Sequence, residues 1–146
     1  MKIIKIENEK ETFSLGMELG RNCCGGEVFA LCGNLGAGKT KLTQGIAAGL
    51  GVAGRVNSPT FNILKVYRVT ANKNLGKKIK TLCHIDAYRL ESGRDLEALG
   101  IREFFDSAAT VTVIEWAEKV KEIWPKGIRV IKIETGVKER RRIKVY

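Results

Sequence analysis

The stretch LCGNLGAGKTKL, residues 31–42, decides the fold. It ends an apolar run and carries the pattern G-x-x-x-x-G-K-T. Glycines let such a loop turn and approach phosphates closely, while backbone amides at the start of the following helix face the anion. The lysine can reach the terminal phosphates, and the threonine hydroxyl is placed to bind Mg²⁺. The pattern predicts a loop that binds a nucleoside triphosphate through Gly33, Asn34, Leu35, Gly36, Ala37, Gly38, Lys39 and Thr40.

The context of this loop argues against a chance glycine turn. A near-continuous apolar run, residues 27–32, precedes it, as is typical of a strand buried on both faces of a parallel sheet. After it, Leu42, Ile46 and Leu50 recur at a spacing of four, and Gly51 follows as a C-terminal cap. A strand, a glycine loop and an amphipathic helix in this order favour a phosphate-binding function.

Length and charge limit what surrounds the loop. The chain has 146 residues, which predicts a single domain, residues 1–146, with no room for a separate substrate domain. No run of eighteen apolar residues occurs, and the first residues become charged too soon for a signal peptide. We therefore expect a cytoplasmic protein that does not enter a membrane.

The formal net charge is +10, from 26 Lys and Arg against 16 Asp and Glu. This excess suits a nucleic acid, an acidic protein partner or solubility alone. Residues 28–85 hold nine Lys or Arg and no carboxylate, so a Mg²⁺ ligand beyond the loop hydroxyl must come from elsewhere. Asp86 is the first candidate downstream.

The periodicity of the remaining chain predicts alternating elements. We expect Phe13, Met17, Leu19 and Gly20 to lie near one face of the first helix, and residues 62–69 and 78–85 to form a hairpin. The predicted strands are residues 3–6, 27–32, 62–69, 78–85, 110–116, 128–134 and 141–146, and the predicted helices are 7–23, 39–50, 94–106 and 116–124. The fold class is α/β, a P-loop NTPase-like three-layer fold with a mixed, mainly parallel central sheet.

Two carboxylates, Asp86 and Glu115, end strand-like runs. Ligands of open parallel sheets lie beyond the carboxyl ends of the strands, so both acids are expected to face the loop. One would hold Mg²⁺ with Thr40 while the other orients a water. The alternative for each is an ordinary surface acid. Strand alternation places His84 on the side of Asp86, as a catalytic or a structural residue, with Cys83 facing the core.

Other chemistry is weakly supported. The guanine-reading pattern N-K-x-D is incomplete at residues 72–75, and D-x-x-G is absent, which favours ATP over GTP. The four cysteines form no C-x-x-C pair and only one histidine is present, so neither zinc nor a disulfide framework is expected. Cys32 and Cys83 lie in apolar runs and are interpreted as small buried side chains.

Five motifs in order resemble the TsaE family, formerly called YjeE. They are GNLGAGKT (33–40), SPTF (58–61), HIDAYRL (84–90), ALGIREFFD (98–106) and IEW (114–116), and they span nearly the whole chain. The resemblance implies a small bacterial ATPase with ATP and Mg²⁺ as cofactors. It would act with the partner proteins TsaB and TsaD in making N6-threonylcarbamoyladenosine in tRNA, and the tRNA would be contacted chiefly through that complex.

The resemblance also implies roles for single residues. Asp86 would be the catalytic acid, and Lys39 and Thr60 would also be catalytic residues. Thr60 would sense the γ-phosphate or its metal. Glu115 would bind Mg²⁺ together with Thr40, and Trp116 could pack near the nucleotide. Arg89 is open between a phosphate and Glu91 as partners.

Two rival functions remain. A small-molecule or nucleoside kinase would share the loop but needs an acceptor pocket and usually an arginine-bearing lid, neither of which is evident. A nucleic-acid-binding module is suggested by the net charge and by VKERRRIKVY, residues 137–146. For that segment a solvated edge strand is the favoured interpretation.

Overall fold

Seven strands form one mixed sheet in a computed structural model that describes residues 1–59, 61–70 and 78–146. The spatial order is β1-β7-β6-β2-β5-β4-β3. The strands are β1 (Lys2–Ile6), β2 (Val28–Cys32), β3 (Leu64–Arg68), β4 (Thr81–Asp86), β5 (Thr110–Glu115), β6 (Arg129–Thr135) and β7 (Arg141–Val145).

Strand direction confirms the expected mixed, mainly parallel sheet. The four central strands β6, β2, β5 and β4 pair in parallel, whereas β3 and β7 run antiparallel to their neighbours. Because β1 is antiparallel to β7, it shares the direction of the central four, so five of the seven described strands run the same way.

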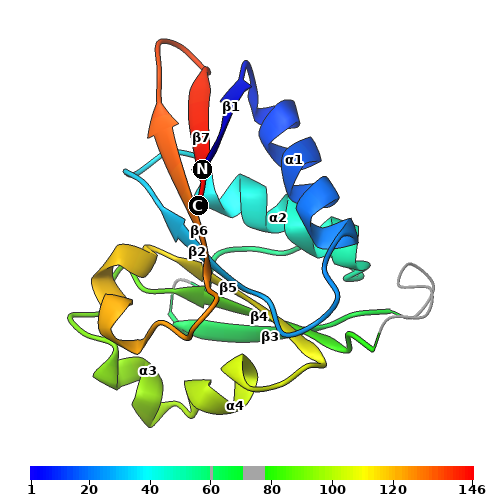
Figure 1. Cartoon of the computed structure of the whole chain (residues 1–146), viewed down its shortest axis with the longest axis vertical. Coiled ribbons are helices and arrows are strands. Elements are labelled where there is room, and N and C mark those ends of the chain that lie inside the picture. Colours follow the sequence, from blue (N-terminus) through cyan, green and yellow to red (C-terminus); the bar gives the residue numbers. More distant parts are fainter. Residues whose placement is uncertain (60, 71–77) are drawn as a thin grey trace.

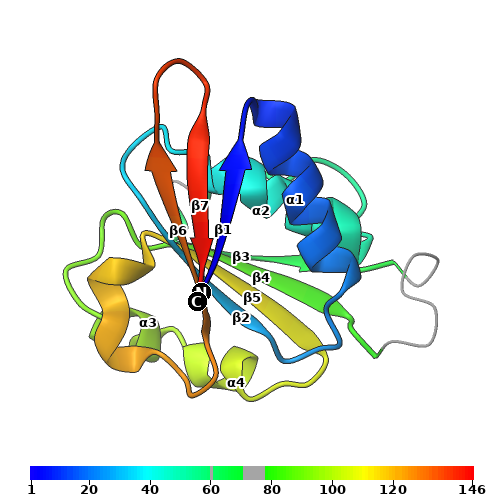
Figure 2. The same cartoon turned by 45° about the horizontal axis from the view of Figure 1, so that its top comes forward.

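Helices cover the two faces of this sheet and make three layers (Figures 1 and 2). On one face lie α1 (Glu9–Arg21) and α2 (Lys39–Leu50); on the other lie α3 (Arg94–Ala98), α4 (Ile101–Phe105) and the 3₁₀ helix η2 (Ala117–Ile123). Alternation along β2 divides the core accordingly: Phe29 and Leu31 belong to the cluster with α1 and α2, and Val28 and Ala30 to the other.

Most predicted elements are confirmed, with one helix divided in two. The α2 helix ends at Gly51, whose φ of 92° is the left-handed cap expected there. The predicted helix 94–106 is instead α3 and α4, because Gly100 between them has a φ of 76°. Leu99, just before this glycine, is exposed, whereas Ile101, just after it, is buried. Most of the predicted hairpin turn, residues 71–77, lies outside the described residues.

The buried face of α1 differs in part from the predicted one. Gly20 is buried as predicted, but Phe13, Met17 and Leu19 are only half-buried, and the other fully buried positions are Thr12 and Gly16. These small residues let α1 approach α2 closely, since a Cβ built on Gly16 would lie 2.4 Å from the Leu42 carbonyl oxygen. On α2 the matching residues are Gly45 and Gly49. The two helices therefore pack backbone to backbone.

We expect Gly45→Ala to destabilise the protein. A Cβ at this position would lie 2.2 Å from the Phe13 carbonyl oxygen, a backbone atom that cannot move without shifting α1. Alanine favours a helix over glycine by about 1 kcal/mol, but overpacking typically costs about 1–3 kcal/mol, and here a backbone must shift. Urea unfolding should show a lower midpoint than wild type. An unchanged or higher midpoint would mean that the two helices are not held at this distance.

The last strand, β7, is not an edge strand. It lies between β1 and β6, and its pairing runs from Ile131↔Val145 to Thr135↔Arg141. The favoured interpretation of residues 137–146 as a solvated edge strand is therefore wrong. No helix in the described part of the chain is long and apolar enough to cross a membrane.

Candidate functional site

The glycine loop connects β2 to α2 at the carboxyl end of the central strands. Gly38 precedes α2 with a φ of 103°, and Gly33, with a φ of 150°, packs so closely that a Cβ would lie 2.5 Å from the Ile133 carbonyl oxygen. The loop amides are expected to face a bound phosphate. The Ala37 amide instead donates to the Asn34 carbonyl within the loop. For the amides of Leu35, Gly36 and Gly38, no acceptor is found among the described residues.

A hollow of about 440 Å³ lies beside this loop. Asp86, Glu115, Trp116, Lys39 and Thr40 all line it, so the structure brings together candidates from three separate segments. The remaining lining residues are Glu9, Leu35, Gly36, Ala37, Gly38, Lys41, Gln44, Ser58, Tyr88 and Arg141.

Lys39 is buried and folds back onto its own loop. Its Nζ donates to the carbonyl oxygens of Gly33 at 2.6 Å and Asn34 at 2.9 Å. Nζ also lies 3.7 Å from the ring centroid of Trp116, a cation–π distance. Burial lowers the pKa of Lys39, and the nearby carboxylates, Glu115 first, partly oppose this. The ammonium is held where a phosphate on the loop would meet it.

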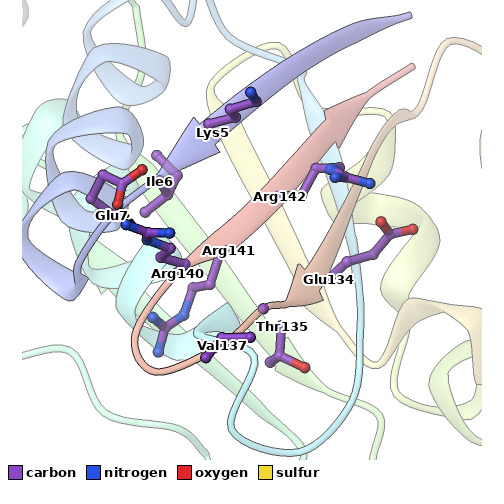
Figure 3. A pocket seen from close by; sticks show the side chains of 10 residues that line it. Lys5, Ile6, Glu7, Glu134, Thr135, Val137, Arg140, Arg141 and Arg142 are labelled. Carbon is purple, nitrogen blue, oxygen red and sulfur yellow. Dashed lines mark hydrogen bonds and ion pairs between the residues drawn. The ribbon is translucent and has the colours of Figure 1, made fainter.

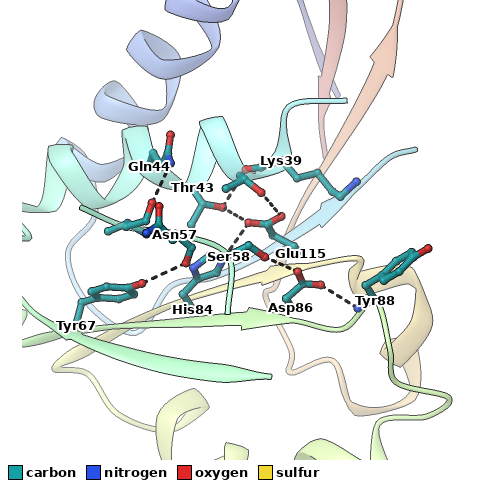
Figure 4. A network of polar contacts seen from close by, with 12 residues as sticks. Lys39, Thr43, Gln44, Asn57, Ser58, Tyr67, His84, Asp86, Tyr88 and Glu115 are labelled. Carbon is teal, nitrogen blue, oxygen red and sulfur yellow. Dashed lines mark hydrogen bonds and ion pairs between the residues drawn. The ribbon is translucent and has the colours of Figure 1, made fainter. Parts of the chain in front are cut away.

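Glu115 is the centre of the polar network (Figure 4). Its buried carboxylate accepts hydrogen bonds from Thr40 Oγ1 at 2.9 Å and Thr43 Oγ1 at 3.2 Å. His84 Nε2 contacts it at 2.8 Å, so with a proton on Nε2 the histidine donates a third. Several donors fix the orientation of this carboxylate and compensate its burial.

Asp86 lies next to Glu115 but engages different groups. The two residues are register partners in the parallel pair β4 and β5. The Asp86 carboxylate accepts from Ser58 Oγ at 2.5 Å and from the Tyr88 amide at 3.0 Å. Neither acid is thus an ordinary surface carboxylate, and each is paired with a different hydroxyl.

The arrangement fits a Mg²⁺ ion bound partly by other groups. A threonine hydroxyl and a carboxylate in contact are hard oxygen ligands of the kind that Mg²⁺ prefers. Among the described residues, no three His, Cys, Asp or Glu side chains gather as in an all-protein metal centre. That also agrees with Mg²⁺, which usually takes one or two protein ligands and completes its shell with phosphates and waters.

Aromatic residues close one side of the pocket. Trp116 follows β5 with a φ of 57°, an uncommon value for a residue other than glycine, and this turn brings its indole over Lys39. The Tyr88 ring lies 4.9 Å from that of Trp116. Trp124 caps the C-terminal end of η2, and its Nε1 donates to the Ala117 carbonyl.

Some site residues were not singled out by sequence reasoning. Thr43 lies one helical turn after Thr40, and that spacing was the only signal available for it. Arg141 comes from β7, and its Nε donates to the Ala37 carbonyl at 2.9 Å. Nothing local in the sequence places Arg141 against the loop, because the contact depends on where β7 enters the sheet.

The other predicted residues have mixed outcomes. Thr60 lies outside the described residues. Arg89 lies over the ring of Phe61, 5.4 Å from its centroid, and no contact with Glu91 is found among the described residues. Cys83 is buried and Cys32 half-buried, and burial, aided for Cys32 by Glu118, raises the pKa of each thiol to about 12. The prediction of a buried side chain is confirmed for Cys83, whereas Cys32 is buried only in part.

The sheet with parallel central strands, the glycine loop between β2 and α2, and the acids at the neighbouring strand ends define a P-loop NTPase-like protein. Comparison with known families is more specific. The family model described as "Threonylcarbamoyl adenosine biosynthesis protein TsaE" matches residues 6–143. The chain belongs to the TsaE family of tRNA threonylcarbamoyladenosine biosynthesis.

Individual relatives agree with this assignment. The tRNA threonylcarbamoyladenosine biosynthesis protein TsaE of Haemophilus influenzae is 38% identical over 71% of this chain, a match that spans 60% of its own length. The protein of the same name from Bacillus subtilis is 41% identical over 81% of this chain and 68% of its own. The crystal structure of Bacillus subtilis YdiB is similar with a TM-score of 0.75 and 30% identity, covering 97% of this chain and 82% of that one.

Proposed function

We propose that this protein binds and slowly hydrolyses Mg-ATP to support a TsaB–TsaD complex in the N6-threonylcarbamoyladenosine modification of tRNA. The observation that carries the proposal is the contact of Thr40 with Glu115 beside the glycine loop, with Asp86 as the next residue across the sheet. The proposal includes a cytoplasmic location, where tRNA is available.

Each residue of the pocket has a distinct part in this proposal. Lys39 exchanges its two loop carbonyls for terminal phosphate oxygens, and the free amides of the loop donate to the remaining ones. Thr40 and Glu115 hold Mg²⁺, which when bound neutralises charge developing on the phosphates. His84 and Thr43 orient Glu115 and do not touch the nucleotide.

Asp86 is proposed to orient the attacking water. Its carboxylate is already fixed by Ser58 and the Tyr88 amide, and it lines the same pocket as Glu115. A carboxylate within hydrogen-bond reach of a water can hold it in line with the γ-phosphate, a contribution that comes from positioning. Thr60, in the adjacent segment, is proposed to contact the γ-phosphate or the metal.

Exposed apolar side chains around the pocket support a role for partner proteins. Leu35 and Tyr88 line the pocket yet are 80% and 51% exposed, and Phe61, near Arg89, is 85% exposed. Neighbouring exposed hydrophobic side chains are a feature of protein interaction sites. A partner that covers them would also exclude water from the pocket, which strengthens the electrostatic contacts inside it. TsaB and TsaD are the partners we propose.

The test is steady-state ATP turnover by the pure protein, alone and with purified TsaB and TsaD, with and without tRNA. We expect a low rate alone and a several-fold higher rate with the pair. The Lys39→Ala protein, measured in parallel, reports contaminating ATPase. The proposal would be contradicted if ATP turnover were unchanged by TsaB and TsaD but rose with a metabolite that becomes phosphorylated. That result would show a kinase.

A further inference from the structure

One half of the sheet has a face that is covered by no helix of the described residues (Figure 2). Figure 2 shows that α3, α4 and η2 lie under the strands from β2 to β3 and not under β1 and β7. The core on that side accordingly includes no residue of β1 or β7. The side chains of β1, β7 and β6 that point to this face include four cations and one carboxylate, Glu134. We call the four cations, Lys5, Lys132, Arg142 and Lys144, the open basic face.

The pairing of the strands sets these cations against one another. Lys5 is the register partner of Arg142, and Lys132 is the register partner of Lys144. Like charges directly opposite across a sheet are destabilising. Because β6 and β7 are interior strands, Lys132, Arg142 and Lys144 do not serve to protect a sheet edge, whereas Lys5 lies on the edge strand β1. Glu134 contacts Lys144 at 2.7 Å and Lys132 at 3.8 Å and so offsets part of the repulsion. A further anion bound between the strands would relieve the rest.

A hollow of about 450 Å³ lies at one end of the open basic face (Figure 3). Four cations line it, among them Lys5 and Arg142, with two carboxylates. Both carboxylates are already engaged: Glu7 accepts from Arg140 at 2.8 Å, and Glu134 accepts from Lys144 at 2.7 Å.

The two carboxylates do not offset all the cations of this hollow. The hydrogen bond from Lys144 lowers the pKa of Glu134, so this carboxylate stays ionised and bonded to Lys144. Glu134 is also the register partner of Arg142, and the positive charge of Arg142 contributes to the lowered pKa. Within residues 1–59, 61–70 and 78–146, neither Lys5 nor Arg142 forms a salt bridge of its own.

We propose that the open basic face binds the sugar-phosphate backbone of RNA. The choice of RNA rests on the proposed function, which places tRNA near this protein. The choice is also supported by Tyr146, which continues the alternation of Arg142 and Lys144. The backbone amide of Tyr146 donates a hydrogen bond to the Val130 carbonyl. Its side chain is 58% exposed. Cations that track a backbone, together with an exposed aromatic ring for stacking, are the usual elements of single-stranded RNA recognition.

The open basic face lies close to the pocket beside the glycine loop. Arg141 lines both the basic hollow and the pocket beside the glycine loop, and it donates to the loop carbonyl of Ala37. RNA bound at Arg142 would thus lie next in sequence to Arg141, the residue that contacts the glycine loop. The protein would contact tRNA directly, in addition to any contact made through its partners.

The test is fluorescence anisotropy of a labelled, unmodified tRNA titrated with the pure protein at several salt concentrations. We expect the logarithm of the binding constant to fall linearly with the logarithm of salt, with a slope of about −0.7 to −0.9 for each phosphate contacted. The double variant Lys5→Ala/Arg142→Ala should reduce the magnitude of the slope by roughly 1.4 to 1.8.

The matched control is Lys78→Ala/Lys80→Ala, which removes two exposed lysines near the start of β4 and the same charge. It should leave the salt slope unchanged. If the two double variants lose equal tRNA affinity and salt slope, the effect comes from net charge alone, and the proposal is overturned. Absence of tRNA binding at low salt would overturn it as well. Displacement of the tRNA by polyglutamate at equal charge concentration would assign the face to an acidic protein.

Failure of this proposal can be told apart from failure of the proposed function. Lys5 and Arg142 are exposed and do not line the pocket, so the double variant should keep wild-type thermal stability and wild-type ATP turnover without RNA. Intact turnover with no tRNA binding would overturn the RNA proposal alone. Absent turnover with salt-dependent tRNA binding would overturn the ATPase proposal and leave this one standing.

Discussion

Replacing Lys39 by methionine is expected to lower ATP turnover about 100- to 1,000-fold, the loss typical when one preorganised donor to a developing negative charge is removed. Methionine keeps an unbranched apolar stem where Lys39 is buried beside Trp116, but it has no ammonium for the phosphates. Lys39→Ala should lose at least as much. The measurement is kcat and KM for ATP at saturating Mg²⁺, together with nucleotide binding by calorimetry.

The control for Lys39 is Lys10→Ala, which removes an exposed lysine of α1 and should keep wild-type kinetics. Folding must be checked, because Lys39 also donates to the carbonyls of Gly33 and Asn34 and its loss leaves both without this donor. Circular dichroism and the unfolding midpoint report this separately. A folded Lys39→Met protein with wild-type turnover would refute the assignment of Lys39 to the phosphates.

Replacing Glu115 by glutamine is expected to raise the Mg²⁺ concentration for half-maximal turnover about 10- to 100-fold. Glutamine keeps the shape and one acceptor oxygen, which can replace the Oε1 that faces Thr43 and His84, but it loses the charge that binds the metal. Alanine would also remove the acceptor for Thr40 and His84 at a buried position, whereas Thr43 keeps the Lys39 carbonyl, so alanine confounds stability with metal affinity. The measurement is turnover as a function of Mg²⁺ at constant ATP.

Asp86→Asn provides the comparison for Glu115. If Asp86 orients the water while Glu115 holds the metal, Asp86→Asn should lower kcat and leave the Mg²⁺ requirement near wild type. The division follows from geometry, since Thr40 is bonded to Glu115 and Ser58 to Asp86. A raised Mg²⁺ requirement in Asp86→Asn, with none in Glu115→Gln, would reverse the two roles.

Much of this architecture could be predicted because local sequence and general sheet rules agree. The glycine loop is contiguous, so its place between a strand and a helix is readable without tertiary information. Asp86 and Glu115 are 29 positions apart in the chain, yet both end buried strands, and the rule that ligands lie at the carboxyl ends of parallel strands predicts that they face the loop.

The errors arose where the deciding contact was distant or the side chain small. Apolar periodicity assigns Phe13 and Met17 to the inner face of α1, but the fit against α2 is decided by the absence of side chains at Gly16 and Gly20. Gly100 divides a helix through a left-handed conformation that periodicity does not detect. The charged pattern of β7 resembles an edge strand because its uncovered face is exposed, although both of its backbone edges are paired.

The strand order also bears on how the chain folds as it is synthesised. The glycine loop follows β2, whose two neighbours, β5 and β6, are made roughly 80 to 100 residues later. Until residue 135 or so has left the ribosome, β2 cannot be paired on both edges, and the loop lacks the Ile133 carbonyl against which Gly33 packs. Non-local pairing of this kind is slow to form. A nascent chain halted before β6 should therefore remain unable to retain nucleotide, and binding should appear abruptly once β6 emerges.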